Sequence, residues 1–192
     1  VIFTTPNQIN SFKESFQNMG VDKVYYFENE VFKDYSTDYY SKLIVNLVGI
    51  IKPEILLIGA TNQGRDLAPR VSGALNTGLT ADCTELDINE KGQLAATRPT
   101  FGGQLMATIL CKNYPQMATV RPNVLKITQP ETIKNTELIS CPANIECLKN
   151  RVELLNFCKT NNLEINDLDS AEIIVAGGKG LKNEKGFELL KQ

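Results

Sequence analysis

Histidine and tryptophan are both absent from this sequence of 192 residues. Without histidine, the chain cannot build a Ser-His-Asp triad or a Cys-His pair from its own residues. It also lacks the commonest ligand of catalytic zinc. Acid–base work would fall to Asp, Glu, Lys, Tyr or Cys, and none of these stands in a recognisable catalytic arrangement. We therefore expect no catalytic residue, no metal site and no enzymatic activity of the chain on its own.

A surplus of one charge and long apolar runs are lacking as well. Twenty basic residues stand against 22 acidic ones, and the net charge is −2. We therefore expect no nucleic-acid partner and no attraction to an anionic membrane. The longest apolar runs, such as residues 55–58, are far too short for membrane insertion. The five cysteines show no C-x-x-C spacing, which favours free thiols in a reducing compartment over a disulfide framework.

Strands and helices alternate through the first part of the chain. Continuous apolar runs predict buried strands, and apolar residues at helical spacing predict the helices that follow them. Thr5 is expected to cap the first helix. The predicted elements, in chain order, are a strand at 1–5, a helix at 6–19, a strand at 23–27, a helix at 37–51, a strand at 55–58 and a helix at 64–75. This alternation indicates βαβ units and an α/β fold with a parallel sheet.

The pattern changes after Gly78. Short strands with brief turns predict an antiparallel addition to the sheet, and a polar stretch then predicts a linker to a second unit. The expected elements are strands at 95–97, 105–111 and 117–125, further candidate strands at 137–141 and 151–158, a linker at 160–169, a strand at 172–176, a glycine turn at 177–180 and a helix from 184. We predict a first domain at residues 1–168 and the start of a second at 169–192.

Residues 59–66 follow a strand, open a helix and imitate the spacing of a P-loop. The imitation fails because Arg65 replaces the phosphate-binding lysine and Asp66 replaces the hydroxyl that would hold magnesium. A tight strand-to-helix turn is the simpler interpretation, with Thr61 or Asn62 as the cap. Anion binding at this helix end stays open.

Two other groups of residues could carry chemistry. Asp82 stands beside Cys83, but no basic residue lies nearby in sequence to ionise the thiol. A buried cysteine beside a turn-forming aspartate is therefore favoured. Arg98 and Arg121 each precede a proline, and together they flank the antiparallel stretch. They suit either phosphate or carboxylate binding, or ion pairs in the fold or at an interface, and the sequence leaves both open.

The last motif is the glycine turn at residues 177–180, between a predicted strand and a predicted helix. Such a unit begins many nucleotide-binding sites. The strict G-x-G-x-x-G pattern fails, because Asn183 occupies the third glycine position. A cofactor loop and a plain turn both fit this spacing.

Taken together, three stretches resemble the alpha subunit of electron-transfer flavoproteins. They are residues 57–70 (LIGATNQGRDLAPR), residues 78–84 (GLTADCT), and residues 98–103 (RPTFGG) with 106–108 (MAT) and 116–122 (QMATVRP). The resemblance runs over nearly the whole chain.

This resemblance implies a Rossmann-like α/β domain with helices on both faces of its sheet, which pairs with a beta subunit and does not itself carry the flavin. The FAD-binding domain would follow, and the chain would hold only its truncated beginning, with the family's first strand and helix upstream of Val1. FAD in the complete heterodimer would carry electrons between acyl-CoA or other dehydrogenases and an acceptor. The expected location is cytoplasmic in a bacterium, or the mitochondrial matrix in a eukaryote.

The family usually has Ser-Gly-Gly-Arg-Gly before its second domain, and the arginine contacts FAD. Residues 176–180 match this stretch, so Gly178, Lys179 and Gly180 are the predicted cofactor-binding residues. Lys179 keeps the charge of the arginine but lacks its planar fork. We expect the chain alone not to retain FAD, because the pocket walls would come from residues after Gln192 and from the partner.

Two further expectations concern binding. The antiparallel stretch 98–121 is the candidate surface for the beta subunit. The alternative function is an adenine-nucleotide-binding α/β module that acts as a hydrolase or a sensor. Nucleotide titration separates the two, because only the alternative requires the isolated chain to bind a nucleotide.

Overall fold

The computed structural model describes residues 1–126, 128, 130, 135–156, 171, 173–188 and 190. The chain divides into two units, Val1–Glu153 and Leu154–Gln192. The predicted linker at 160–169 and the predicted boundary after residue 168 lie outside the described residues. The assignment of domains therefore stays a prediction.

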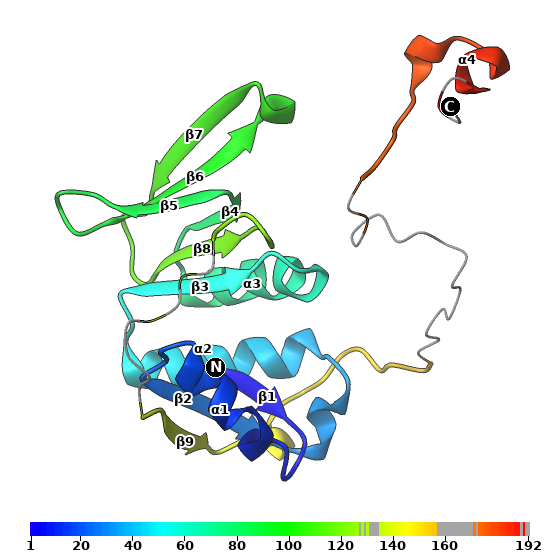
Figure 1. The fold of residues 1–192 in the computed structure, drawn as a ribbon. Helices are drawn as coiled ribbons and strands as arrows, with labels where there is room; N and C mark the ends of the chain where they lie inside the picture. Colours follow the sequence, from blue (N-terminus) through cyan, green and yellow to red (C-terminus); the bar gives the residue numbers. More distant parts are fainter. Residues whose placement is uncertain are drawn as a thin grey trace. The chain divides into compact units, whose positions relative to one another are not determined.

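The first unit contains two parallel sheets of three strands each (Figure 1). One has the order β1–β2–β9, from Ile2–Thr4, Lys23–Glu28 and Glu137–Cys141. The other has the order β3–β8–β4, from Ile55–Gly59, Gln116–Val120 and Leu79–Cys83. The predicted α/β class is confirmed, and the parallel strands are grouped in two sheets of the same size.

A third sheet is antiparallel and has the order β5–β6–β7, from Glu85–Ile88, Leu94–Thr100 and Leu105–Leu110. This sheet confirms the predicted antiparallel extension. The strand predicted at 117–125 was wrongly assigned to it, because β8 pairs in parallel with both β3 and β4. Residues 116–119 of β8 are all buried, as is typical of a central strand in a parallel sheet.

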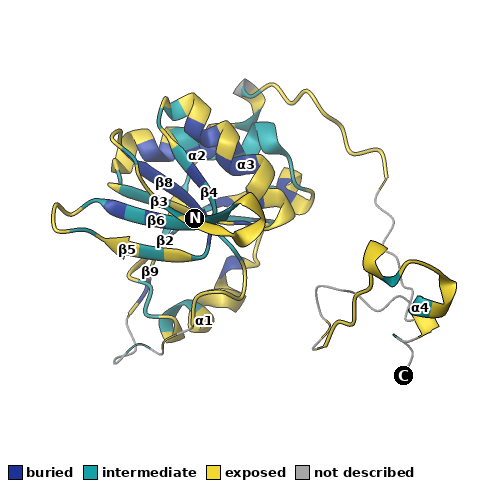
Figure 2. Ribbon diagram, turned by 90° about the horizontal axis from the view of Figure 1, so that it is seen from above, coloured by how far each residue is buried: buried dark blue, intermediate teal, exposed yellow. Residues whose placement is uncertain are grey.

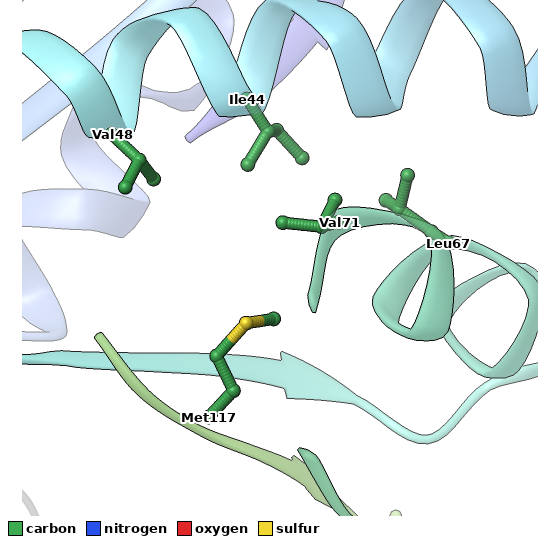
Figure 3. Packing of buried hydrophobic residues seen from close by; sticks show 5 residues of the cluster. All are labelled: Ile44, Val48, Leu67, Val71 and Met117. Atoms are coloured by element: carbon green, nitrogen blue, oxygen red, sulfur yellow. The ribbon is translucent and has the colours of Figure 1, made fainter. Parts of the chain in front are cut away.

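The helices α2 (Thr37–Ile51) and α3 (Asn62–Leu75) pack against each other and against β8. The apolar cluster between them consists of Ile44, Val48, Leu67, Val71 and Met117 (Figure 3). Val71 is fully buried and Met117 is 1% exposed. The helical spacing of Ile44 with Val48, and of Leu67 with Val71, therefore corresponds to one shared core.

A second cluster ties α2 to the sheet of β1, β2 and β9. It contains Leu43 and Leu47 of α2 together with Phe27 of β2. Phe3 of β1 stacks on Phe27, with the ring centroids 5.2 Å apart. Because α2 buries residues in both clusters, this one helix connects the two parallel sheets.

Figure 2 shows α2 and α3 on one side of the strands and α1 on the other. The long first helix predicted at 6–19 is instead a 3-10 turn, η1 (Ile9–Phe12), followed by a short α1 (Lys13–Asn18). Thr5 does not cap a helix, because Asn7 has a positive φ of 68° and its N–H donates to Glu28 Oε1. The backbone therefore turns at Asn7 before any helix begins.

In the second unit, η5 (Lys179–Leu181) precedes α4 (Glu184–Glu188), which confirms the predicted helix start. The strand predicted at 172–176 does not form over residues 173–176, where Ile173 is 84% exposed. These residues have no neighbouring strand to hydrogen-bond with among the described residues of this unit. Residues 151–156 of the strand predicted at 151–158 are likewise not in a strand, and the rest lies outside the described residues.

One short turn, η2 (Glu30–Lys33), precedes α2, and two more, η3 (Phe101–Gly103) and η4 (Ile145–Cys147), follow β6 and β9. Among the helices of the described residues, none has both the length and the apolar character needed to cross a membrane.

Candidate functional site

The segment that imitates a P-loop is a close-packed turn between β3 and α3. Thr61 caps α3, since its Oγ1 accepts a hydrogen bond of 3.1 Å from the N–H of Gly64. A Cβ atom on Gly64 would lie 1.8 Å from the carbonyl oxygen of Gly59, so only glycine fits where the helix approaches the strand. The prediction of a tight strand-to-helix turn is confirmed.

Asp66 forms hydrogen bonds within the fold at this turn. Its carboxylate accepts hydrogen bonds from the hydroxyl of Tyr35, at 2.9 Å, and from that of Thr37. Burial raises the pKa of Tyr35 to about 12, and the nearby Asp66 carboxylate acts in the same direction. The contacts tie the start of α3 to the segment that enters α2.

An Arg–Asp–Arg group lies at the carboxyl ends of β3, β8 and β4, the edge where ligands bind in parallel α/β sheets. Asp82 receives Arg65 Nη2 on Oδ1 at 3.0 Å and Arg121 Nη2 on Oδ2 at 2.6 Å. Arg65 also donates from Nε to the carbonyl of Ala60 at 2.9 Å. One carboxylate therefore holds two guanidinium groups that come from different segments.

The backbone of Asp82 is itself fixed. Its φ of 62° is rare for a residue other than glycine, and the pairing of β4 with β8 shifts register between Thr80 and Cys83. The N–H of Asp82 donates to Thr119 Oγ1 at 2.7 Å. The hydrogen bond from Arg121 holds the pKa of Asp82 below its usual value, although burial acts against this shift.

Arg98 of β6 completes the group without a partner of its own. Its Nε is buried and lacks a hydrogen-bond partner, and its side chain forms no ion pair with any residue that the structure describes. A cavity of about 210 Å³ lies beside it, lined among others by Arg65, Asp82 and Thr119. Of the two interpretations open for the Arg-Pro pairs, Arg121 therefore follows the ion-pair one and Arg98 does not.

The thiol of Cys83 has no catalytic setting. Cys83 is fully buried, and its Sγ donates to the carbonyl of Thr80 at 3.3 Å. Burial raises the pKa of this thiol, although the charge of Arg98 acts against the shift. The prediction of a buried cysteine beside a turn-forming aspartate is confirmed, and Cys83, Cys111 and Cys141 are free thiols.

The residues predicted for cofactor binding lie together in the second unit. Gly178 precedes η5, and Lys179 and Gly180 lie within it, all three exposed. A Cβ atom on Gly177 would lie 2.3 Å from Leu181 Cδ1, whereas Gly178 and Gly180 have open space at the same position. A side chain at position 177 would thus have to displace the tip of Leu181, whereas positions 178 and 180 are free of such contacts. The role of residues 178–180 toward FAD stays a prediction.

The edge strand β7 exposes apolar side chains on both of its faces. Leu105 and Met106 are 59% and 56% exposed, and Ile109 and Leu110 are 41% and 47% exposed. Phe101, in the turn between β6 and β7, is 79% exposed. We call these five residues the β7 edge. Exposed apolar residues gathered on an edge strand are typical of a surface that binds another protein.

The fold and these sites define a mixed α/β domain with an antiparallel extension, an arginine-rich strand edge and an exposed apolar edge strand. The sequence model of the electron transfer flavoprotein domain matches residues 1–144. This chain belongs to that family.

Curated relatives extend the likeness. The chain is 42% identical to electron transfer flavoprotein subunit alpha of Thermoanaerobacterium thermosaccharolyticum over 187 residues, which are 97% of this chain and 56% of the relative. It is 46% identical to the protein FixB of Clostridium saccharobutylicum over 178 residues, 89% of this chain and 51% of the relative. The chain spans about half the length of the curated relatives it matches.

Sequence reasoning found the turn at Gly64 and both arginines, but not the grouping of Arg65, Asp82 and Arg121. The partners are 17 and 39 residues apart along the chain, and no local signal connects them. The alternation of apolar residues in β7 gave no sign that both of its faces would be exposed.

Proposed function

We propose that this chain is the N-terminal part of an electron-transfer flavoprotein alpha subunit, which pairs with a beta subunit. The complete heterodimer holds FAD and carries electrons between dehydrogenases, of the acyl-CoA or another type, and an acceptor. The observation that carries the proposal is the 42% identity to a subunit alpha over 97% of this chain. The flavin performs the redox chemistry and the protein positions it, so the chain is a carrier subunit rather than a catalyst.

The β7 edge is the proposed surface for the beta subunit. Its exposed leucine, isoleucine, methionine and phenylalanine side chains can contribute apolar burial at an interface, and they belong to the segment 98–121 that the sequence singled out. Arg121 is already held by Asp82, so we assign the binding energy to the apolar side chains rather than to this arginine. The partner's binding thus leaves the Arg–Asp–Arg group intact.

Lys179 is the proposed contact to FAD in the complete protein. The support is its position in an exposed glycine turn that matches the family's arginine-containing stretch. A cation near the isoalloxazine ring stabilises the anionic reduced flavin relative to the neutral oxidised one. The 192-residue chain alone is expected to be colourless, because the few backbone N–H groups of this turn cannot enclose a cofactor as large as FAD.

The full-length alpha subunit with its beta subunit tests both parts of the proposal. We expect Lys179→Ala to lower the reduction potential of the flavin or to weaken FAD binding, and Lys179→Arg to restore it. Lys182→Ala is the matched control, because Lys182 is an exposed lysine that follows the same turn. If Lys179→Ala behaves like the control, the wrong residue has been assigned. If the complete heterodimer holds no flavin, the proposed function itself is wrong.

The alternative of an adenine-nucleotide-binding module has less support. Asp66 stands where a P-loop has the hydroxyl that holds magnesium. Its carboxylate instead accepts hydrogen bonds from Tyr35 and Thr37 within the fold. Titration of the chain with ATP and ADP distinguishes this alternative from the flavoprotein subunit. Saturable binding of the adenine and ribose would favour the alternative.

A further inference from the structure

We propose that the cavity between α3, β4, β6 and β8 binds a phosphate group, with Arg98 and Arg65 as its ligands and Asp82 as a positioning residue. The cavity measures about 210 Å³ and is lined by Arg65, Asp82, Arg98 and Thr119 together with apolar side chains of α3 and β4. This site does not depend on flavin or on the beta subunit.

The side chains around this cavity carry a net positive charge. Three arginines, Arg65, Arg98 and Arg121, act on the single carboxylate of Asp82. Each oxygen of that carboxylate already pairs with one arginine, Oδ1 with Arg65 and Oδ2 with Arg121. The group therefore keeps an excess of two positive charges, and Arg98 is left without an ion pair among the described residues. A dianion would balance this excess.

Arg98 and Arg65 also have N–H donors that the described structure leaves unused. The Nε of Arg98 is buried and donates to no acceptor among the described residues, and an unsatisfied buried donor is costly. Asp82 does not accept from it in the described structure, where its two oxygens receive Arg65 and Arg121. Arg65 uses Nε for Ala60 and Nη2 for Asp82, so its Nη1 is still available within the described structure. Phosphate oxygens match guanidinium groups in both geometry and charge.

Hydrogen bonds already hold Arg65 and Asp82 in place before any ligand binds. Arg65 is held at two atoms, and Asp82 is held through its N–H by Thr119 and through its carboxylate by Arg121. The donors therefore need little reordering when an anion enters. The cavity is also lined by Asp82 and Thr119, near the carboxyl ends of β4 and β8, the side on which parallel α/β sheets bind ligands.

Size limits the ligand. A cavity of about 210 Å³ is smaller than those that enclose whole organic ligands, which begin at roughly 300 Å³. It accepts a phosphate group but not a nucleoside. The source is therefore free inorganic phosphate, or the phosphate end of a larger molecule whose remainder stays outside the cavity.

Arginine Nε–Hε resonances of the 192-residue chain offer a direct test. We titrate sodium phosphate at neutral pH, with sodium chloride at matched ionic strength as the reference. We expect the Arg98 and Arg65 signals to move saturably with phosphate and not with chloride, with a dissociation constant of about 1 mM or tighter. Shifts that are the same in both salts would overturn the proposal.

Two variants locate the site. Arg98→Gln is expected to weaken phosphate binding about tenfold or more, and Arg98→Lys less, with circular dichroism reporting that each variant is folded. Lys91→Gln removes the same charge from an exposed turn and is expected to leave the midpoint unchanged. If Arg98→Gln binds phosphate as the unaltered chain does, the assignment is wrong.

A second titration with glycerol phosphate distinguishes the sources: tighter binding than that of inorganic phosphate indicates a larger molecule, and weaker binding indicates the free ion.

Discussion

Arg121 and Asp82 join the carboxyl ends of β8 and β4 through a hydrogen bond of 2.6 Å between Nη2 and Oδ2. The backbone N–H of Arg121 also donates to the carbonyl of Cys83 at 2.9 Å. Two consecutive residues of β4 are thus held by one residue that follows β8. This pairing fixes the bulge of β4 and orients the carboxylate that Arg65 shares.

The lowered pKa of Asp82 predicts a pH dependence of stability. A carboxyl whose pKa is lower in the folded chain than in the unfolded chain stabilises the fold above its unfolded pKa, and the stabilisation disappears as the pH falls through the folded pKa. We therefore expect Asp82→Asn to destabilise the chain at neutral pH. The difference in the free energy of unfolding between the two proteins should shrink below about pH 4.

Urea denaturation at several pH values measures this difference. Asp87→Asn is the control, because Asp87 is an exposed aspartate of β5 that pairs with no arginine in the part of the chain that the structure describes. A constant difference between Asp82→Asn and the unaltered chain from neutral to acidic pH would show that the ion pairs of Asp82 do not contribute through its ionisation.

The close approach of α3 to β3 predicts opposite effects for two glycines of one helix. Gly64→Ala would place Cβ 1.8 Å from the Gly59 carbonyl oxygen and force the helix away, at a cost of about 3 kcal/mol or more. Gly73→Ala meets no atom within 4 Å and should stabilise the helix by about 0.5–1 kcal/mol. Chemical denaturation compares them, and equal effects of both would contradict the packing at Gly64.

The cluster shared by α2, α3 and β8 predicts a large effect at Met117, which is 1% exposed. Met117→Ala should lower the free energy of unfolding by about 2–5 kcal/mol, since it removes buried atoms and leaves a cavity. Met19, which is 69% exposed, is the matched control, and Met19→Ala should change stability by less than about 0.5 kcal/mol. A small loss at Met117 would show that the core beneath α2 and α3 is loosely packed.

The sequence predicted helix ends correctly where a residue within a few positions along the chain determines them. The cap at Thr61 and the end of α2 before Pro53 follow from chemistry within a few positions. The same kind of signal misled at Thr5, because the turn at Asn7 depends on Glu28, which is 21 residues away. A cap motif does not reveal that a distant carboxylate competes for the backbone.

Strand partners and the candidate site depended on long-range contacts. Residues 116–120 combine apolar and polar side chains, and only the folded chain shows them between β3 and β4. Arg98 and Arg121 each precede a proline, yet only Arg121 reaches Asp82. Sequence could therefore propose anion binding or ion pairing for both arginines, but it could not divide the two roles between them.

Sedimentation of the chain with its cognate beta subunit tests the central claim most directly. We predict that the two proteins, co-expressed and mixed at about 1 µM, sediment as one heterodimer. Met106→Glu with Leu110→Glu, two substitutions in the β7 edge, should weaken the complex at least about tenfold, because each places a charge in an apolar interface. Ile50→Glu, at a residue of α2 that is 78% exposed, should not weaken it. Separate sedimentation of the unaltered chain and the beta subunit would contradict the assignment of this chain as an alpha subunit.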